Sequence, residues 1–506
     1  MRYLVPVTHQ LDEAIKARTA AFVRGHIVER IWARDHTVWK DDPTELADRL
    51  GWLEVAQDSR AALPGLREFA RSAYADGLRT VLLLGMGGSS LGPEVLRECY
   101  SPSLLDLVVL DSTHPRQIRD TLRRLDLTST LVLVASKSGS TIETAAQAEY
   151  LWSLAGDGKH FAAITDPGSG LAALARSRGF RAVFENRPDI GGRYSVLSLF
   201  GMVPGALIGA PLENLLDEAD AMAGRCHGDP SANPGARLGI FLGEAALDGR
   251  DKCTLVLPGR YRALGWWIEQ LVAESTGKEG RGILPVEGEA LRPPETYGQD
   301  RVFVAYEPSE ALDALGQAGH PVLVLEDAGL GGEFFRWEFA TAVAGAVLGV
   351  QPFDQPNVQE AKDAASIVLS GRQPEIAPMP LEAVLNSLEP GDYLAINAFV
   401  PRDAVNERRL DAIRQRLAVR HRVAVTVGFG PRFLHSTGQL HKGGPPTGAF
   451  IQVTDDFGED IPVPGKPYTF GELLRAQALG DLAALVGRGR RATRVTLDEL
   501  ESAVPA

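Results

Sequence analysis

Short apolar segments that end in glycine- and serine-rich turns recur along the chain, and a helix-like pattern follows each turn. The two clearest are residues 81–84, followed by the turn 85–93, and residues 131–135, followed by the turn 136–141. Segments this short and apolar predict strands of a parallel sheet, buried on both faces. The alternation of strands with helices therefore predicts a doubly wound α/β fold.

The alternation occurs in three blocks, which predicts two doubly wound αβα lobes with parallel sheets plus an additional C-terminal αβ block. The expected domains are an N-terminal region with the first lobe (1–205), a connector with the second lobe (206–385) and the C-terminal block (386–506). Helices are expected over about 10–75 and 334–348, and from 473 onward as an outer layer. Strands are expected near residues 81–84, 105–110, 131–135, 161–164, 253–257, 321–325, 393–399 and 423–427.

The two turns of the first block have the composition of an anion site. A loop that ends at a helix N-terminus directs free backbone N–H groups outward, where the helix dipole favours an anion. Gly87 and Gly88 let the backbone approach closely, and hydroxyl groups add donors. The candidate donors are Ser89, Ser136, Ser138, Ser140 and Thr141. A single glycine-rich turn is often only a tight connection, but the pair of turns predicts a cradle for one phosphate group.

A carboxylate continues an apolar helical stripe in the second block. Leu264, Trp267, Ile268 and Leu271 share one helix face, and Glu274 is the next position on it. A core-facing carboxylate is costly unless it has a partner, so Glu274 is a candidate acid/base group. The alternative is a frayed helix end with Glu274 in water.

Two cations are similarly placed. Lys362 lies on the apolar face of residues 358–365, where it either snorkels to solvent or points into a polar cavity. Arg193 follows the glycine pair Gly191 and Gly192, which exposes a fixed charge; pairing with a surface carboxylate is the alternative. His435 lies in a turn-rich stretch expected to be a surface loop. Its spacing from His441 makes a poor metal site, although either histidine is a possible proton carrier.

Composition narrows the class of protein. The chain is 44% apolar with a net charge of -13, which argues against nucleic acid as a partner. Three cysteines without pairing or ligand spacing fit a reducing, cytoplasmic environment. The sequence shows neither a signal peptide's apolar stretch at its start nor a run of about twenty apolar residues, so a membrane span is not expected.

Taken together, these motifs resemble glucose-6-phosphate isomerases, most closely the isomerase half of bifunctional transaldolase–glucose-6-phosphate isomerases. The matching stretches are Gly85 to Pro93, Ser136 to Thr141, Gly191 to Ser195, Glu274 to Lys278, Phe353 to Lys362 and Leu434 to Gln439. The resemblance implies sugar-isomerase lobes, interconversion of glucose 6-phosphate and fructose 6-phosphate in glycolysis and gluconeogenesis, and no metal or organic cofactor.

The resemblance also implies a role for each residue. Glu274 would move a proton between C2 and C1, Arg193 would stabilise the enediolate, and Lys362 with His435 would open the sugar ring. The phosphate would be held by Gly88, Ser89, Ser136, Lys137, Ser138 and Thr141, with Gly192 and Gln355 close by.

The order of the motifs departs from the family. Many members place the ring-opening histidine shortly after the catalytic glutamate, where this chain has Tyr297-Gly-Gln-Asp300. A histidine motif appears instead at His435, beyond Lys362, with His441 as the alternative. We therefore expect a monomer or a homodimer, with His435 supplied within the chain. Two alternatives remain at this point: a sugar-phosphate sensor without catalysis, and an isomerase for another phosphosugar such as mannose 6-phosphate.

Overall fold

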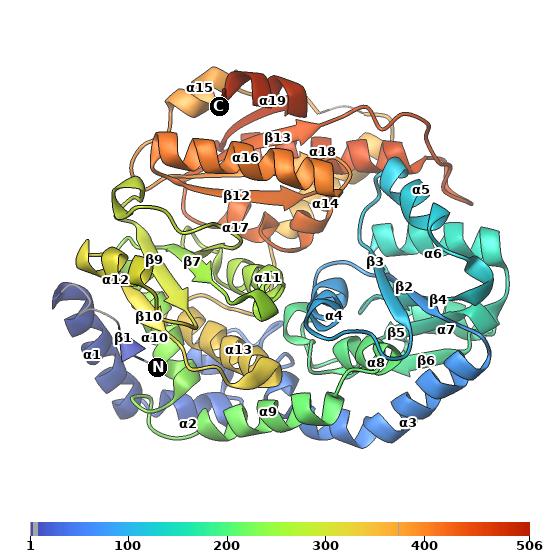
Figure 1. The fold of residues 1–506 in the computed structure, drawn as a ribbon, viewed down its shortest axis with the longest axis horizontal. Helices are drawn as coiled ribbons and strands as arrows, with labels where there is room; N and C mark the ends of the chain where they lie inside the picture. The colour runs from blue at the N-terminus through green and yellow to red at the C-terminus, as the bar shows by residue number, and fades with distance from the viewer. Residues whose placement is uncertain (1, 4–8, 373, 506) are drawn as a thin grey trace.

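The structure is a computed structural model that describes residues 2–3, 9–372 and 374–505; the side chains of residues 2, 3, 9, 358, 359, 361, 362 and 364 are outside this description. Three sheets, each flanked by helices, form three lobes that meet at the middle of the molecule (Figure 1). All strand pairs are parallel except the one made by β1 (Arg2–Tyr3). The predicted α/β class with parallel sheets is confirmed.

The first lobe is a five-stranded sheet in the order β3-β2-β4-β5-β6. Its strands are β2 (Thr80–Leu84), β3 (Asp106–Leu110), β4 (Thr130–Ala135), β5 (Phe161–Thr165) and β6 (Ala182–Glu185). Its helices are α4 (Gly88–Cys99), α5 (Pro115–Arg123), α6 (Ile142–Ala155) and α7 (Gly170–Ser177). The strands β4 and β5 are buried along their whole length, as their apolar sequences predict, whereas the half-buried edge strand β6 was not predicted.

The second lobe is a sheet in the order β1-β10-β9-β7-β8. Its later strands are β7 (Lys252–Val256), β8 (Leu284–Val286), β9 (Arg301–Ala305) and β10 (Val322–Val324). Its helices include α10 (Pro234–Leu247), α11 (Leu264–Thr276), α12 (Glu310–Gln317) and α13 (Gly329–Leu348). Because β1 pairs antiparallel with β10, the beginning of the chain packs on the second sheet, although the sequence grouped it with the first.

The third lobe is a four-stranded sheet in the order β12-β11-β13-β14. Its strands are β11 (Tyr393–Phe399), β12 (Ala424–Phe429), β13 (Gly448–Thr454) and β14 (Arg491–Thr496), and its helices are α15 (Leu381–Asn386), α16 (Ala404–His421), α17 (Gly438–Gly443), α18 (Phe470–Gly487) and α19 (Leu497–Ala503). The outer layer predicted from residue 473 onward is wrong in part. Helix α18 buries many of its residues, among them Leu473 and Asp481, and the tail then adds β14 to the sheet.

Further helices cover the base of the first two lobes: α1 (His9–Arg24), α2 (Ile27–Trp32), α3 (Val55–Ala75), α8 (Leu199–Ile208) and α9 (Leu212–Arg225). Helix α14 (Val358–Leu369) leads to the third lobe. In the part of the chain that the structure describes, no helix is long and apolar enough to cross a membrane.

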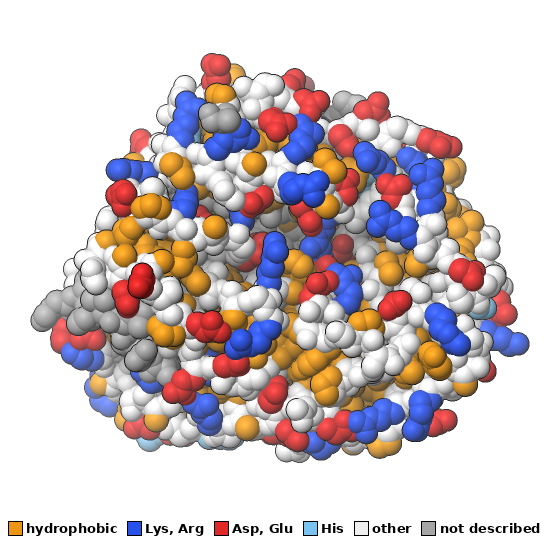
Figure 2. Space-filling view, viewed as in Figure 1, with side chains coloured by type: hydrophobic (Ala, Val, Ile, Leu, Met, Phe, Trp, Pro, Cys, Tyr) orange, Lys and Arg blue, Asp and Glu red, His pale blue; other side chains and the backbone are white. Residues whose placement is uncertain are grey.

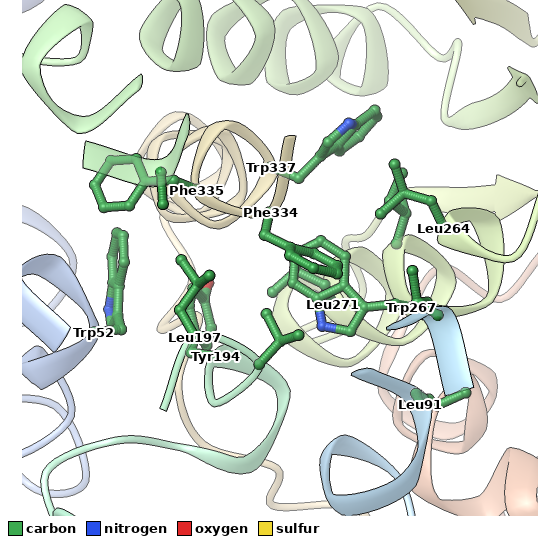
Figure 3. Packing of buried hydrophobic residues seen from close by; sticks show 14 of the residues in the cluster. Trp52, Leu91, Tyr194, Leu197, Leu264, Trp267, Leu271, Phe334, Phe335 and Trp337 are labelled. Carbon is green, nitrogen blue, oxygen red and sulfur yellow. The ribbon is translucent and has the colours of Figure 1, made fainter. Parts of the chain in front are cut away.

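Helix α11 lies between the lobes, and large apolar side chains fix its position (Figure 3). Trp267 packs edge-on against Phe334 of α13, with ring centroids 5.0 Å apart. Leu271 is fully buried in the same cluster, and Leu91 of α4 belongs to it as well. Removing a leucine side chain from such a core costs about 2–5 kcal/mol, so the end of α11 is rigidly held.

Candidate active site

The first glycine loop lies close to elements of all three lobes. Gly87 has a φ of 54°, in the left-handed region that favours glycine, and a Cβ there would meet the Gln270 side chain and the His435 carbonyl oxygen. A Cβ on Gly88 would overlap the carbonyl oxygen of Gly192. Gly88 therefore lies against Gly192, and Gly87 lies against residues of the second and third lobes.

The second loop has the hydroxyl arrangement expected of an anion site. Ser136 Oγ donates to Thr141 Oγ1 over 3.2 Å and accepts from the backbone N–H of Gly139 at 3.1 Å. Helix α6 begins at the next residue, so its first N–H groups face this loop. Ser138 and Ser140 are exposed and hydrogen bond to each other. The loop thus combines hydroxyl donors with a helix N-terminus.

Lys137, also in this loop, is already paired with a carboxylate of the first lobe. Its ammonium group pairs with Asp166 and donates to the carbonyl oxygen of Pro188. Ser89 is buried at the first turn of α4. The loop's contribution to an anion therefore comes from hydroxyl and backbone groups in this structure, and Lys137 would have to leave Asp166 to add its charge.

Glu274 and Arg193 form a buried ion pair at the end of α11. The carboxylate Oε1 lies 3.5 Å from Arg193 Nη1, and the side chains are 10% and 3% exposed. Arg193, in the 3-10 helix η5 (Gly192–Tyr194), is held by four further acceptors. These are Ser275 Oγ at 2.8 Å, Gln355 Oε1 at 3.0 Å, and the carbonyl oxygens of Pro352 and Asp354 at 2.7 Å each. The sequence predicted that a core-facing Glu274 needs a partner, and in the structure that partner is Arg193.

His435 reaches this group from the third lobe of the same chain. Its Nε2 lies 2.8 Å from Glu143 Oε1, and its backbone carbonyl accepts from Gln270 Nε2 at 2.6 Å. The same Gln270 amide donates to Glu274 Oε2 at 3.2 Å. A continuous set of contacts therefore runs from the helix that follows the second loop, through His435, to the carboxylate and Arg193.

Glu143 is a site residue that the sequence analysis missed. It is 3% exposed, lies in the first turn of α6 and also accepts from Gln477 Nε2 of α18 at 2.6 Å. An acidic residue at that position ordinarily complements a helix dipole, which explains why the pattern gave no functional signal. A carboxylate accepts but does not donate, so Glu143 fixes the proton of His435 on Nε2 and leaves Nδ1 as the acceptor.

Lys278 is a second missed residue, four positions beyond Glu274. The ammonium group is 2.6 Å from Asp354 Oδ1 and 2.5 Å from the carbonyl oxygen of Gln351, and the side chain is 3% exposed. Burial and the neighbouring Arg193 lower the pKa of Lys278 to about 7, against the opposing effects of Asp354 and Glu274. The motif Glu274 to Lys278 carried this residue, but its lysine had no assigned role.

The other two candidate residues, His441 and Lys362, add no described contact to this group. Contrary to the surface loop expected there, the stretch around His435 folds into the 3-10 helix η8 (Arg432–His435) and the buried helix α17. His441 is 1% exposed among the rings of Tyr393, Phe433 and Phe450. Burial, Lys442 and Arg490 place the pKa of His441 well below its usual value. Lys362 lies in α14, but its side chain is outside the described residues.

Two further observations bear on the chemistry. Asp300, at the place where many family members have their histidine, forms an ion pair with Lys252 at 3.1 Å in the second lobe. Within the described residues, no group of three or more histidine, cysteine or acidic side chains is arranged to hold a metal ion. The arrangement offers a carboxylate, a fixed cation, an oriented imidazole and an anion loop, which together suit proton transfer on a phosphorylated substrate.

Comparisons with known proteins find relatives in sequence and in fold. The sequence profile of the family described as Phosphoglucose isomerase matches residues 69–280. A glucose-6-phosphate isomerase of Thermosynechococcus vestitus is 31% identical over 301 residues, covering 54% of this chain and 55% of that protein. This chain therefore spans about half the length of that relative.

Two solved structures share the fold. A hypothetical protein from Thermus thermophilus has a TM-score of 0.61 at 24% identity, covering 72% of this chain and all of that one. A glucose-6-phosphate isomerase from Chlamydia trachomatis has a TM-score of 0.53 at 23% identity, covering 68% of this chain and 78% of that one. The profile match contains the glycine loop, Arg193 and Glu274. Residues 69–280 of the chain are therefore related in sequence to the phosphoglucose isomerase family.

Proposed function

We propose that this protein is an aldose–ketose isomerase that interconverts glucose 6-phosphate and fructose 6-phosphate. The observation that carries the proposal is the buried Glu274–Arg193 pair, which the Gln270 amide joins to His435. A mobile proton needs a base, and the enediolate left behind needs a cation that is already in place. The chain's own folding supplies both within one hydrogen-bonded group.

The steps follow from the positions of these groups. With the phosphate bound at residues 136–141, Glu274 takes the proton from C2 of the open-chain aldose and returns it to C1. The negative charge that develops on the enediolate oxygens is stabilised by Arg193, whose Nη1 and Nη2 groups are held by the loop at residues 351–355 and whose Nε is held by Ser275. Such positioned acid/base catalysis is typically worth about 10²–10⁴-fold.

Ring opening falls to His435. Since Glu143 holds the proton on Nε2, Nδ1 is the acceptor for a sugar hydroxyl proton. Lys362, whose helix position matches the family motif, is proposed to assist. The histidine comes from the same chain as Glu274, so one chain holds both groups, and we propose that a monomer suffices for activity. The motif from Leu434 to Gln439 also supports a relationship to the isomerase half of the bifunctional enzymes.

The deciding experiment is a coupled assay of purified protein with fructose 6-phosphate, run beside mannose 6-phosphate. Formation of glucose 6-phosphate at a rate that falls with Glu274→Gln supports the proposal. Binding of fructose 6-phosphate without turnover would identify a sensor. Turnover of mannose 6-phosphate in preference to glucose 6-phosphate would assign the other epimer.

A further inference from the structure

The loop at residues 351–355 is built around two cations, although the proposed chemistry uses only Arg193. Arg193 donates hydrogen bonds to the carbonyl oxygens of Pro352 and Asp354 and to the side-chain oxygen of Gln355. Lys278 donates a hydrogen bond to the carbonyl oxygen of Gln351 and forms an ion pair with the Asp354 carboxylate. The loop thus presents five oxygens to two buried positive charges.

The position of Asp354 makes this arrangement consequential. The backbone carbonyl oxygen of Asp354 accepts a hydrogen bond from Arg193 Nη2. The Asp354 carboxylate therefore belongs to a residue that already contacts Arg193, the cation proposed to stabilise the enediolate. A carboxylate freed at this place would compete with Glu274 and with an enediolate for the guanidinium charge. In the structure Lys278 holds that carboxylate at 2.6 Å, and Arg193 Nη1 faces Glu274 instead.

We propose that Lys278 is a positioning residue of the isomerase: it neutralises Asp354 and thereby keeps the charge of Arg193 available to Glu274 and the enediolate. The inference rests on the proposed function. The charged groups that face Lys278 are Arg193 of η5, Asp354 of the loop and Glu274 of α11. A cavity of about 310 Å³, lined by Lys278, Asp354, Asn357 and Arg488 among others, adjoins the pair. Water in it can exchange protons with the amine.

The structure gives this device a pH dependence. The pKa of Lys278 is lowered from 10.5 to about 7, so the amine is charged below that pH and neutral above it. The neutral amine no longer balances Asp354. Activity on the free enzyme should therefore fall as pH rises through about 7, and Lys278→Arg, whose charge does not titrate, should move that alkaline limit to higher pH. An unchanged limit in Lys278→Arg would contradict the assignment.

The decisive test is a double-mutant cycle in kcat. Lys278→Met should lower kcat by about 10²-fold, as misplacement of a catalytic group does, with a much smaller change in KM. Adding Asp354→Asn removes the uncompensated carboxylate but keeps the backbone carbonyl, so the double variant should recover at least about tenfold. A folded double variant as inactive as Lys278→Met would show that Lys278 does not act through Asp354.

A control is Lys252→Met with Asp300→Asn, at another buried lysine of the second lobe, where Lys252 Nζ lies 3.1 Å from Asp300 and 2.7 Å from Asp251. It should lower stability but leave kcat of the folded enzyme unchanged. The same four Lys278 and Asp354 proteins should also show a coupling free energy in unfolding. If the wild type does not turn over fructose 6-phosphate, the proposed function fails, whereas a cycle without coupling in unfolding overturns the Lys278–Asp354 link on its own.

Discussion

The first and third lobes are both parallel sheets, but they contribute to the candidate site in opposite ways. The first lobe contributes two loops at the carboxyl ends of β2 and β4, each only a few residues long. The third lobe contributes His435, and only because the lobe is docked in one position. The difference teaches that the candidate binding groups are local in sequence, whereas the place of the candidate proton carrier His435 depends on tertiary contacts.

The docking of the third lobe is electrostatic close to His435. Arg432 Nη1 pairs with Glu94 Oε2 at 2.5 Å and with Asp111 Oδ2 at 2.8 Å, both in the first lobe. Arg402 reaches the other Glu94 oxygen at 3.0 Å, and its guanidinium lies 4.8 Å from the ring of Trp266. Figure 2 shows a hollow with charged side chains around it near the middle of this face, where Figure 1 places α4 and α11. Arg432, the first residue of η8, thus ties the helix that ends at His435 to the first lobe.

The largest expected effect lies on α11, between the two lobes. Glu274→Gln keeps the shape of the side chain but removes the proton acceptor, so kcat should fall by about 10²–10⁴-fold while phosphosugar binding survives. The measurements are the coupled assay and calorimetric binding of fructose 6-phosphate. Glu279→Gln, an exposed carboxylate in the turn that follows α11, is the matched control. Equal losses of binding and turnover would make Glu274 structural.

The next effect tests whether the third lobe serves its own chain. His435→Ala should lower turnover by about 10²-fold, because ring opening loses its proton carrier. Mixing inactive Glu274→Gln with inactive His435→Ala after dissociation and reassociation should restore no activity, since each chain provides both groups to itself. The assay is run beside a mass measurement of the oligomer. Recovery of activity in mixed oligomers would show that His435 crosses between subunits.

The first lobe's contribution should appear in binding rather than in chemistry. Ser136→Ala with Thr141→Ala removes hydroxyl donors from the anion loop, each charge-assisted hydrogen bond being worth roughly 1.5–3 kcal/mol. Affinity for fructose 6-phosphate should fall, and affinity for inorganic phosphate should fall with it. Ser153→Ala, on the exposed far part of α6, is the control. If fructose without its phosphate weakens equally, the loop is not the phosphate site.

The last prediction, with the smallest expected effect on activity, concerns stability at the contact between the first and third lobes, where Glu94 meets Arg432 and Arg402. Burial alone would raise the pKa of Glu94, but Arg432, Arg402 and Arg97 lower it from 4.5 to about 2. A carboxyl whose pKa is lowered in the folded state stabilises the fold above its usual pKa of 4.5, and this contribution is lost as pH falls through the lowered pKa. Glu94→Gln should abolish that acid-dependent part of the unfolding free energy. The exposed Glu98→Gln should leave it intact, and a Glu94→Gln protein with an unchanged acid profile would contradict this assignment.

The strands of the first lobe were predictable because their signals are local. The apolar residues 81–84 and 131–135 are long enough for buried strands and too short for buried helices, and the glycine and hydroxyl residues that follow are adjacent in sequence. The same holds for the stripe from Leu264 to Leu271, which placed Glu274 on a buried helix face. The sequence analysis missed strands β6, β8, β9, β13 and β14. Strands β6 and β14 are part-polar and give weak patterns, and β8 is only three residues long.

The sequence by itself indicated the α/β alternation, although not every strand in it, and singled out the two candidate anion loops and Glu274, Arg193 and His435 as candidate site residues. Only the tertiary structure decided which groups act on them: Glu143 on His435, Gln270 between His435 and Glu274, and Lys278 on Asp354. The physical reason is distance along the chain. A loop's hydrogen bonds are fixed by a few neighbouring torsions, whereas a contact between residues 143 and 435 exists only after three lobes have packed their apolar surfaces together.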